Sequence, residues 1–409
     1  MKKSKKKNVY YYLFDWANSP FSTIVITFVF SSYFTSTIAN NKISGTSLWG
    51  WTIALSGFFI AIFSPYLGYL ADKKKSFSKN FLVFSTLVVV ILSSSLWFAN
   101  ENVNVLLFLL IILISNFFFE TGQAFYNSQL INFKGEKNYG EFSGKAWASG
   151  YLGGIFCLVV ILTLFLIPEK SIFNLNEKEY ENIRICGPIV GLWFLIFSIP
   201  FLTSLKKNYI SKQMLSSSNF FNRLKLLKKD KNLIKFFIAR MLYTDGLITL
   251  FSFGGIYASG TFNFSFNDII IFGIAINITA ALGAYIFGFV EDRIGIKKVI
   301  LTSLVLLIFI CLLILIVNNK VYFWVLGTMI GFFIGSIQSS SRTALVSLSE
   351  SKNINSLFGL YATSGKITNF LGPLLVATFT AIFESQKAGM ATILIFLFLG
   401  LFLFNRVKI

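Results

Sequence analysis

A lysine inside an apolar segment is the feature of this sequence that most needs a chemical explanation. Lys366 lies in FGLYATSGKITNFLGP (358–373), within an apolar run over residues 354–383 that is long enough to cross a bilayer. Inserting a cation there costs about 2.5–3.5 kcal/mol, so we expect Lys366 to face protein or water and to mark a pathway. A second Ser-Gly-Lys sequence ends at Lys145, more than half the chain earlier, and indicates a duplicated, glycine-broken polar helix.

Glu120 is the clearest carboxyl group inside an apolar segment, FFFETGQAFYN (117–127). Such a carboxyl can carry a proton, or it can be the structural partner of a lysine or arginine on a facing helix. Both interpretations stay open. Our hypothesis is that Lys366 holds an anionic group, such as a carboxylate, while Glu120 balances that charge or carries a coupling proton.

Asp245 and Arg240 are two further charges within one apolar segment. They are five residues apart and do not share a helical face, so we expect each to pair with another helix. Asp15 holds the matching position in the first half and is expected at the inner interface. Other polar groups would face a central cavity: Gln123, Asn127, Gln338, Arg342 and Tyr361. Each alone is more often an interhelical hydrogen bond, so the prediction depends on the cluster.

The composition excludes an ordinary soluble protein. Hydrophobic residues make up 55% of the 409 residues and charged residues 13%, against about a quarter in soluble domains. The apolar residues come in long blocks, which predicts helices and not a barrel. Histidine is absent, and the three cysteines have no paired spacing, so we expect no metal, no cofactor and no disulfide. The net charge is +19, and the positively charged residues border apolar spans, which favours a lipid bilayer over nucleic acid as the partner.

Twelve membrane spans are predicted. The first six lie near 12–38, 48–71, 80–99, 104–126, 143–167 and 186–205, and the second six near 233–258, 267–291, 298–317, 321–343, 354–383 and 388–405. Most of the 36 Lys and Arg then fall on one side, since the outer loops hold only Lys42, Lys170, Lys178, Arg184, Lys320 and Lys387. This bias predicts that both termini are cytoplasmic.

The chain divides into two halves at its longest inner loop. We expect an N-terminal six-helix bundle over 1–205, a cytoplasmic loop with a basic amphipathic segment over 206–232, and a C-terminal six-helix bundle over 233–409. The predicted fold class is therefore an all-α membrane protein with twelve transmembrane helices in two pseudo-symmetric six-helix bundles.

A second duplicated motif supports these halves. Gly68 and Asp72 precede three lysines, and Gly288, Asp292 and Arg293 stand at the matching place in the second half. The glycine would let helices approach closely, and the acid followed by bases could latch an inner gate through ion pairs and a neighbouring helix end. We assign Arg342 to this gate as well. The pattern Gly-x-x-x-Asp-Arg-x-Gly-x-Lys matches the loop signature of the major facilitator superfamily, and its second copy fits well.

Several segments together are similar to the vacuole-effluxer-like family of that superfamily. They include YLFDWANS (12–19), FETGQAFYN (119–127), Ser143 to Gly154, Tyr243 to Gly246, Gly335 to Arg342 and Phe358 to Leu374. Members resemble a eukaryotic vacuolar exporter of amino acids. The resemblance therefore implies export of an amino-acid-like solute. Lys145 departs from the small or apolar residue that the family has after Ser-Gly, which leaves its role open.

We therefore expect a monomeric secondary transporter in the plasma membrane of a bacterium, without catalytic residues. It would move a small organic solute by alternating access, with a proton as the candidate coupling ion. The alternatives are a lipid scramblase, a membrane-embedded enzyme and a sensor with a transporter fold. An enzyme would need a cluster of acids, histidines or metal ligands near one membrane face, and the outer loops are short.

Overall fold

The computed structural model describes residues 2–409 apart from 75, 134–137, 169–172, 174, 206–219, 222–228 and 350–352. The described residues form helices and no strands. Among the described residues, eleven helices are long and apolar enough to cross a membrane, and a shorter apolar helix, Leu371–Phe383, completes a twelfth, interrupted span. The predicted fold class is confirmed.

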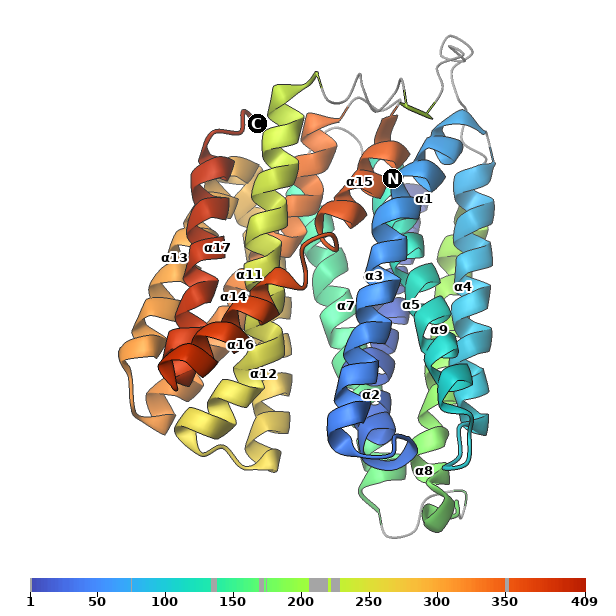
Figure 1. Ribbon diagram of the computed structural model, residues 1–409. Coiled ribbons are helices and arrows are strands. Elements are labelled where there is room, and N and C mark those ends of the chain that lie inside the picture. The colour runs from blue at the N-terminus through green and yellow to red at the C-terminus, as the bar shows by residue number, and fades with distance from the viewer. Residues whose placement is uncertain are drawn as a thin grey trace.

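The first bundle contains the helices from α1 to α9 (Figure 1). Its spans are α1 (Lys2–Pro20) continued by η1 (Phe21–Phe28), α2 (Val29–Tyr33) and η2 (Phe34–Ile38), α3 (Lys42–Lys73), α4 (Phe77–Ser95) with η3 (Leu96–Phe98), α5 (Val105–Ser128), α7 (Tyr139–Ile161) with η4 (Leu162–Leu166), and α9 (Cys186–Ser204). Short helices α6 (Leu130–Phe133), η5 (Glu177–Glu179) and α8 (Glu181–Arg184) lie in the connections.

The second bundle contains α11 (Lys231–Phe262), α12 (Phe266–Ile294), α13 (Ile296–Ile316), α14 (Lys320–Leu348), α15 (Ile354–Ser364), α16 (Leu371–Phe383) and α17 (Gln386–Asn405). Side-chain caps fix several helix starts: Asn41 accepts a hydrogen bond from the backbone of Ser44, and Ser265 forms a capping box with Asp268. Gly295, at φ +95°, makes the sharp turn between α12 and α13. These caps and turns set the bounds of the spans.

The span over 354–383 is broken, as its glycines and proline suggested. Between α15 and α16, residues 365–370 form turns in which Lys366 and Leu371 donate to backbone oxygens three residues earlier. Pro373 lacks a backbone N–H and so cannot support the turn before it. The first copy differs from the expected broken helix, because α7 runs unbroken through Lys145. It has no proline, and Gly150 and Gly153 instead bring α7 close to α1.

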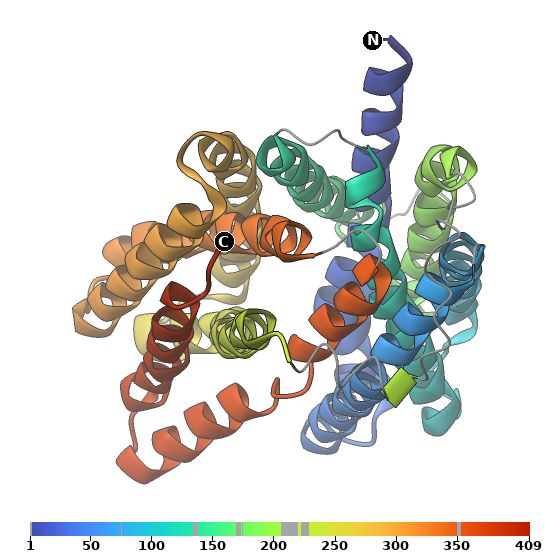
Figure 2. The same cartoon turned by 90° about the horizontal axis from the view of Figure 1, so that it is seen from above.

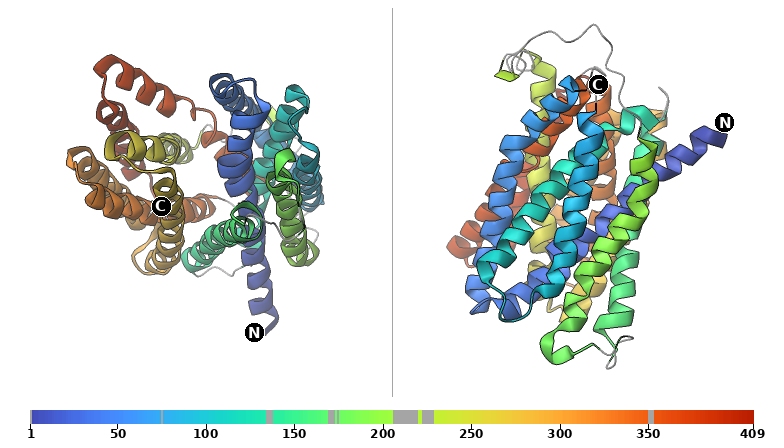
Figure 3. Two further views of the ribbon diagram at one scale, coloured as in Figure 1. Left: turned by 90° about the horizontal axis from the view of Figure 1, so that it is seen from below. Right: turned by 90° about the vertical axis from the view of Figure 1, so that its right-hand side faces the viewer.

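The two bundles lie side by side (Figures 1 and 2). We call the end at which α3, α12 and α14 finish the termini side, since the C-terminus lies there (Figure 1). The bundles meet mainly where α7 crosses α12 and where α3 and α5 pack against α15. The view from below also shows the helices in two groups, one for each bundle (Figure 3).

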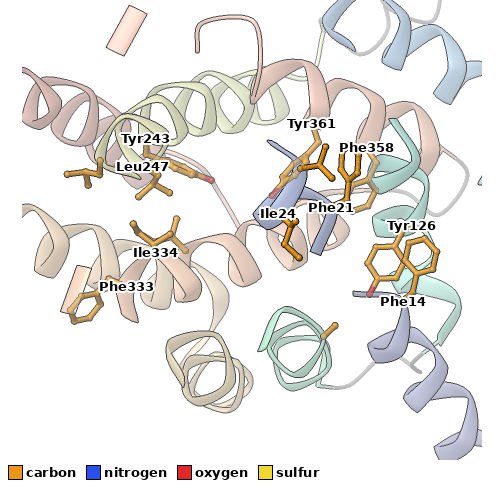
Figure 4. Packing of buried hydrophobic residues seen from close by; sticks show 14 of the residues in the cluster. Phe14, Phe21, Ile24, Tyr126, Tyr243, Leu247, Phe333, Ile334, Phe358 and Tyr361 are labelled. Carbon is orange, nitrogen blue, oxygen red and sulfur yellow. The ribbon is translucent and has the colours of Figure 1, made fainter. Parts of the chain in front are cut away.

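Each bundle has its own aromatic and aliphatic core. Phe14 stacks on Tyr126 with ring centroids 4.7 Å apart in the first bundle, whereas Tyr243 and Leu247 face Ile334 in the second (Figure 4). Most of the expected loop over 206–232 and its amphipathic segment lies outside the described residues, which here include only Phe220, Phe221 and residues 229–232. The ring of Phe220 packs against Tyr66 and Tyr69 of α3.

Candidate functional site

The first glycine–aspartate motif joins α3 to the start of α15. A Cβ atom added at Gly68 would lie 2.4 Å from the backbone oxygen of Asn355, so the two helices touch through their backbones. One turn later, the Asp72 carboxylate accepts from the backbone N–H groups of Asn355 and Ser356 at 3.1 and 3.0 Å, and from both side chains. A negative charge thus caps the N-terminus of a helix in the other bundle.

The second motif makes the same contact with the roles of the bundles exchanged. A Cβ atom at Gly288 of α12 would lie 2.7 Å from the backbone oxygen of Gly140 in α7. Asp292 accepts from the N–H groups of Gly140 and Glu141 at 2.9 and 2.8 Å. Arg293 is exposed, and no ion pair involves it within the described ranges. The two latches are therefore built from carboxylates and helix ends.

Arg342 of α14 lies between the two latches and is fully buried. Its guanidinium donates to Asp15 at 3.3 Å, to the side-chain oxygen of Asn127 at 3.1 Å, and to the hydroxyl and backbone oxygens of Ser143 at 2.9 Å each. Asp15 also accepts from Tyr126 at 2.8 Å. Because α14 belongs to the second bundle and all these partners to the first, the network ties the bundles together at the termini side.

Gln123 and Gln338 extend these contacts. Gln123 donates to Asp15 at 3.3 Å and accepts from Asn18 at 3.0 Å. Gln338 accepts a short hydrogen bond from Tyr151 of α7, which again crosses between the bundles. Glu120, Gln123 and Asn127 are spaced along one face of α5, so a single helix face meets several groups of the interface.

Lys366 and Glu120 form an ion pair across the interface. The Lys366 ammonium lies 2.6 Å from the Glu120 carboxylate, and the two side chains are 21% and 28% exposed. Lys366 lies in the turn at 365–370 of the second bundle, and Glu120 lies on α5 of the first bundle. The pair therefore depends both on the break in the span and on the contact between the bundles. Nearby, the Thr363 hydroxyl donates to the backbone oxygen of Ala61 in α3 at 2.9 Å.

Arg240 of α11 braces the broken span from the other side. It donates at 2.6 Å to the Tyr361 backbone oxygen and to the Ser364 hydroxyl, and its guanidinium lies 3.3 Å from the centre of the Tyr361 ring. This confirms that Arg240 reaches another helix. Asp245 differs from the expectation, because its buried carboxylate forms no ion pair in the described part of the chain.

Lys145 pairs with Glu141 on its own helix at 2.6 Å, and its ammonium lies 5.0 Å from the centre of the Phe289 ring of α12. Two groups at the interface escaped the sequence reasoning. Ser143 is indistinguishable in type from many other serines, and Glu291 looked like part of a charged turn. The structure buries Glu291, which accepts from Ser340 and Thr343 at 2.5 Å. Its position beside Asp292, on the packed face of α12, was the available signal.

The described residues thus form two bundles joined by carboxylate–helix contacts at one end and by a partly exposed ion pair between Lys366 and Glu120. The family model for vacuole effluxer Atg22-like proteins matches residues 135–409. The chain belongs to the vacuole effluxer Atg22-like family. The resemblance that the sequence motifs indicated is confirmed.

Curated relatives and a solved structure are similar to this Atg22-like chain. YxiO, an MFS-type transporter of Bacillus subtilis, is 26% identical over 98% of this chain and 94% of its own length. Autophagy-related protein 22 of Cryptococcus neoformans is 23% identical, covering 64% of this chain and 50% of its own. The E. coli fucose:proton symporter FucP matches the fold with a TM-score of 0.76 at 14% identity, over 100% of this chain and 99% of its own. This Atg22-like chain is therefore a multi-pass membrane transporter of the major facilitator type and not an enzyme.

Proposed function

We propose that this transporter carries amino-acid-like solutes, and that Lys366 and Glu120 bind the two charges common to all of them. The observation that carries the proposal is the 2.6 Å ion pair between these residues. An amino acid presents a carboxylate and an ammonium group on one carbon. Lys366 would take the carboxylate and Glu120 the ammonium, so the solute replaces each partner of the pair without leaving a charge uncompensated.

The exposure of the pair supports this exchange. Both side chains keep about a quarter of their surface accessible, whereas Arg342 and Asp15 are almost fully buried in their own pair. A buried pair is costly to open, because each charge would lose its partner inside the protein. The accessible pair is therefore the better ligand site, and the Arg342 network the better structural tie.

Alternating access would follow from the position of the latches. The contacts made by Asp72, Asp292 and Arg342 hold the bundles together at the termini side, so solute would reach Lys366 from the opposite side in this conformation. Breaking these latches would open the termini side instead, with residues 1–205 and 233–409 moving as the two units.

The distribution of Lys and Arg supports a cytoplasmic termini side. The family's effluxer description supports export, and FucP, named as a proton symporter, makes a proton the first coupling ion to test. We propose a monomer in a bacterial inner membrane, because each chain contains both halves of the site.

Thermal stabilisation by ligand tests the two-charge site. Purified protein is heated with each of the twenty amino acids in turn, and the most stabilising one is compared with its decarboxylated amine and its deaminated acid. A ligand present at 100 times its Kd stabilises the folded state by about 2.7 kcal/mol. We expect neither analogue to stabilise the protein, since each lacks one of the two charges. Lys366→Met and Glu120→Gln should each abolish the effect of the intact amino acid.

Lys320→Met is the matched control. Lys320 forms an ion pair with Asp268 at 2.7 Å on the opposite side, and this hydrogen bond lowers the pKa of Asp268 to about 2. We expect this variant to keep the ligand effect. Equal stabilisation of wild type and Lys366→Met by the same amino acid would overturn the proposed site.

A further inference from the structure

A second charged position lies on the other side of the broken span. Asp245, on α11, is 2% exposed, and its carboxylate forms no ion pair with the described residues. The buried hydroxyl of Thr368, in the turn at 365–370, lies beside this carboxylate as its uncharged hydrogen-bonding neighbour. The first residues of α16 close the site, because a Cβ atom at Gly372 would lie 3.4 Å from the Asp245 backbone oxygen.

Among the described residues, the surroundings of Asp245 offer no counter-charge. Arg240, on the same helix, is directed to Tyr361 and Ser364. Lys366, in the adjoining turn, is paired with Glu120. Helix α16 has no charged residue. The charged residues of the other three helices lie toward the helix ends: Lys387 in α17, Lys320 and Arg342 in α14, and Asp268, Glu291, Asp292 and Arg293 in α12. A carboxylate ion at this place would be desolvated without compensation, whereas a neutral carboxyl avoids that penalty.

The broken span connects this site to the opening of the latches. Its first half, α15, packs against α3 and α5 of the first bundle and is capped by Asp72. Its second half, α16, packs against α17 of the second bundle. When the bundles separate at the termini side, these halves must move relative to each other. The turn that carries Thr368 lies between them, so its movement uncovers Asp245.

We propose that Asp245 is the coupling proton site of this transporter, protonated while the latches are closed and deprotonated when the turn at 365–370 moves. The step is a reversible binding of one proton to one carboxylate oxygen, with release to the water that enters when the site opens. Glu120, which is paired with Lys366, would then serve solute binding and not proton transfer. This inference rests on the proposed transport function, but its first test does not.

Infrared spectroscopy of the membrane-reconstituted protein detects protonated carboxyl groups without any solute. We expect wild type to show a carbonyl band of a protonated, desolvated carboxyl at pH 7, and Asp245→Asn to lose it. Asp245→Glu should shift the band. Glu291→Gln and Glu120→Gln are the matched controls, and both should keep the Asp245 component. If the spectrum of Asp245→Asn equals that of wild type, the proposal is wrong.

Transport in liposomes provides a second readout. With a labelled mixture of the twenty amino acids, Asp245→Asn should lower accumulation driven by a pH gradient at least tenfold while measurable exchange without a gradient persists. Accumulation driven by a sodium gradient instead would overturn the proton assignment. If wild type moves none of the amino acids, the proposed solute fails, but the infrared result still decides the state of Asp245.

Discussion

The charged residues of the interface fall into two kinds that differ in what surrounds them. Arg342 and Asp15 are buried and have several additional hydrogen bonds, which satisfy the remaining donors and acceptors. Lys366 and Glu120 form an ion pair with each other, and both side chains keep partial access to water. Separating Arg342 from Asp15 would leave two buried charges without compensation, so this pair holds the bundles together in the present conformation. Lys366 and Glu120 can instead exchange each other for charged groups of a solute.

Arg342→Gln should destabilise the closed conformation strongly. It leaves Asp15 buried without a counter-charge, and removing one partner of a buried ion pair typically costs about 3–5 kcal/mol. The measurement is the unfolding temperature of the purified protein. The double variant Arg342→Gln with Asp15→Asn should recover part of the loss, because no buried charge then stays unpaired. An unfolding temperature for Arg342→Gln equal to that of wild type would contradict this account of the network.

Sequence reasoning found most of the charged groups of the interface, and it matched Glu120 to the charge of Lys366. It did not predict that Arg342 pairs with Asp15, and it missed Glu291. Lys366 and Glu120 were identifiable because ionisable residues inside apolar segments are rare. Which cation meets which anion depends on helix rotation and on the break in the span, and neither follows from spacing. Ser143 was missed for a related reason, since a hydroxyl gains its importance from the Arg342 guanidinium beside it.

At the scale of elements, backbone-to-backbone helix contacts control the closed state. Gly68 lets α3 touch α15, and Gly288 lets α12 touch α7, in the two related halves. The bounds of the spans followed well from hydropathy, because helices in a bilayer must satisfy their own backbone. That α7 is unbroken could not be predicted from hydropathy, because the same Ser-Gly-Lys sequence lies inside the continuous helix α7 at 143–145 and at the break between α15 and α16 at 364–366. The proline after the second copy is the physical difference.

Leucine at Gly68 should prevent the termini side from closing. Its Cβ atom would meet the backbone oxygen of Asn355 at 2.4 Å, and a backbone atom cannot move aside as a side chain can. Spin labels on cysteines replacing Lys74 and Ile294, exposed positions in different bundles, report the separation by distance measurement. We expect short distances in wild type and longer ones in Gly68→Leu.

Gly50→Leu is the control for this experiment. Gly50 lies in the same helix, α3, and an added Cβ atom there meets no other atom within 4 Å. The native cysteines Cys157, Cys186 and Cys311 are buried and should not react with the label. Identical distance distributions for Gly68→Leu and Gly50→Leu would show that the glycine contact does not control closure.

For the whole molecule, one arrangement connects the parts. An aspartate of each bundle caps a helix of the other bundle. The interrupted span connects the bundles, because α15 packs against helices of the first bundle and α16 packs against helices of the second. The proposed solute site and the proposed proton site lie on either side of the turn in that span. Movement of the bundles would therefore change access to both sites together, which is what coupled transport requires.

Solute counterflow tests this account most directly. Liposomes containing the purified protein are loaded with a mixture of unlabelled amino acids and diluted into a trace of the same mixture carrying label. We expect transient accumulation of label in wild type, none in empty liposomes, and at least a tenfold reduction in Lys366→Met, with Lys320→Met close to wild type. Counterflow that is equal in wild type and Lys366→Met would contradict the central claim that the solute binds at the broken span.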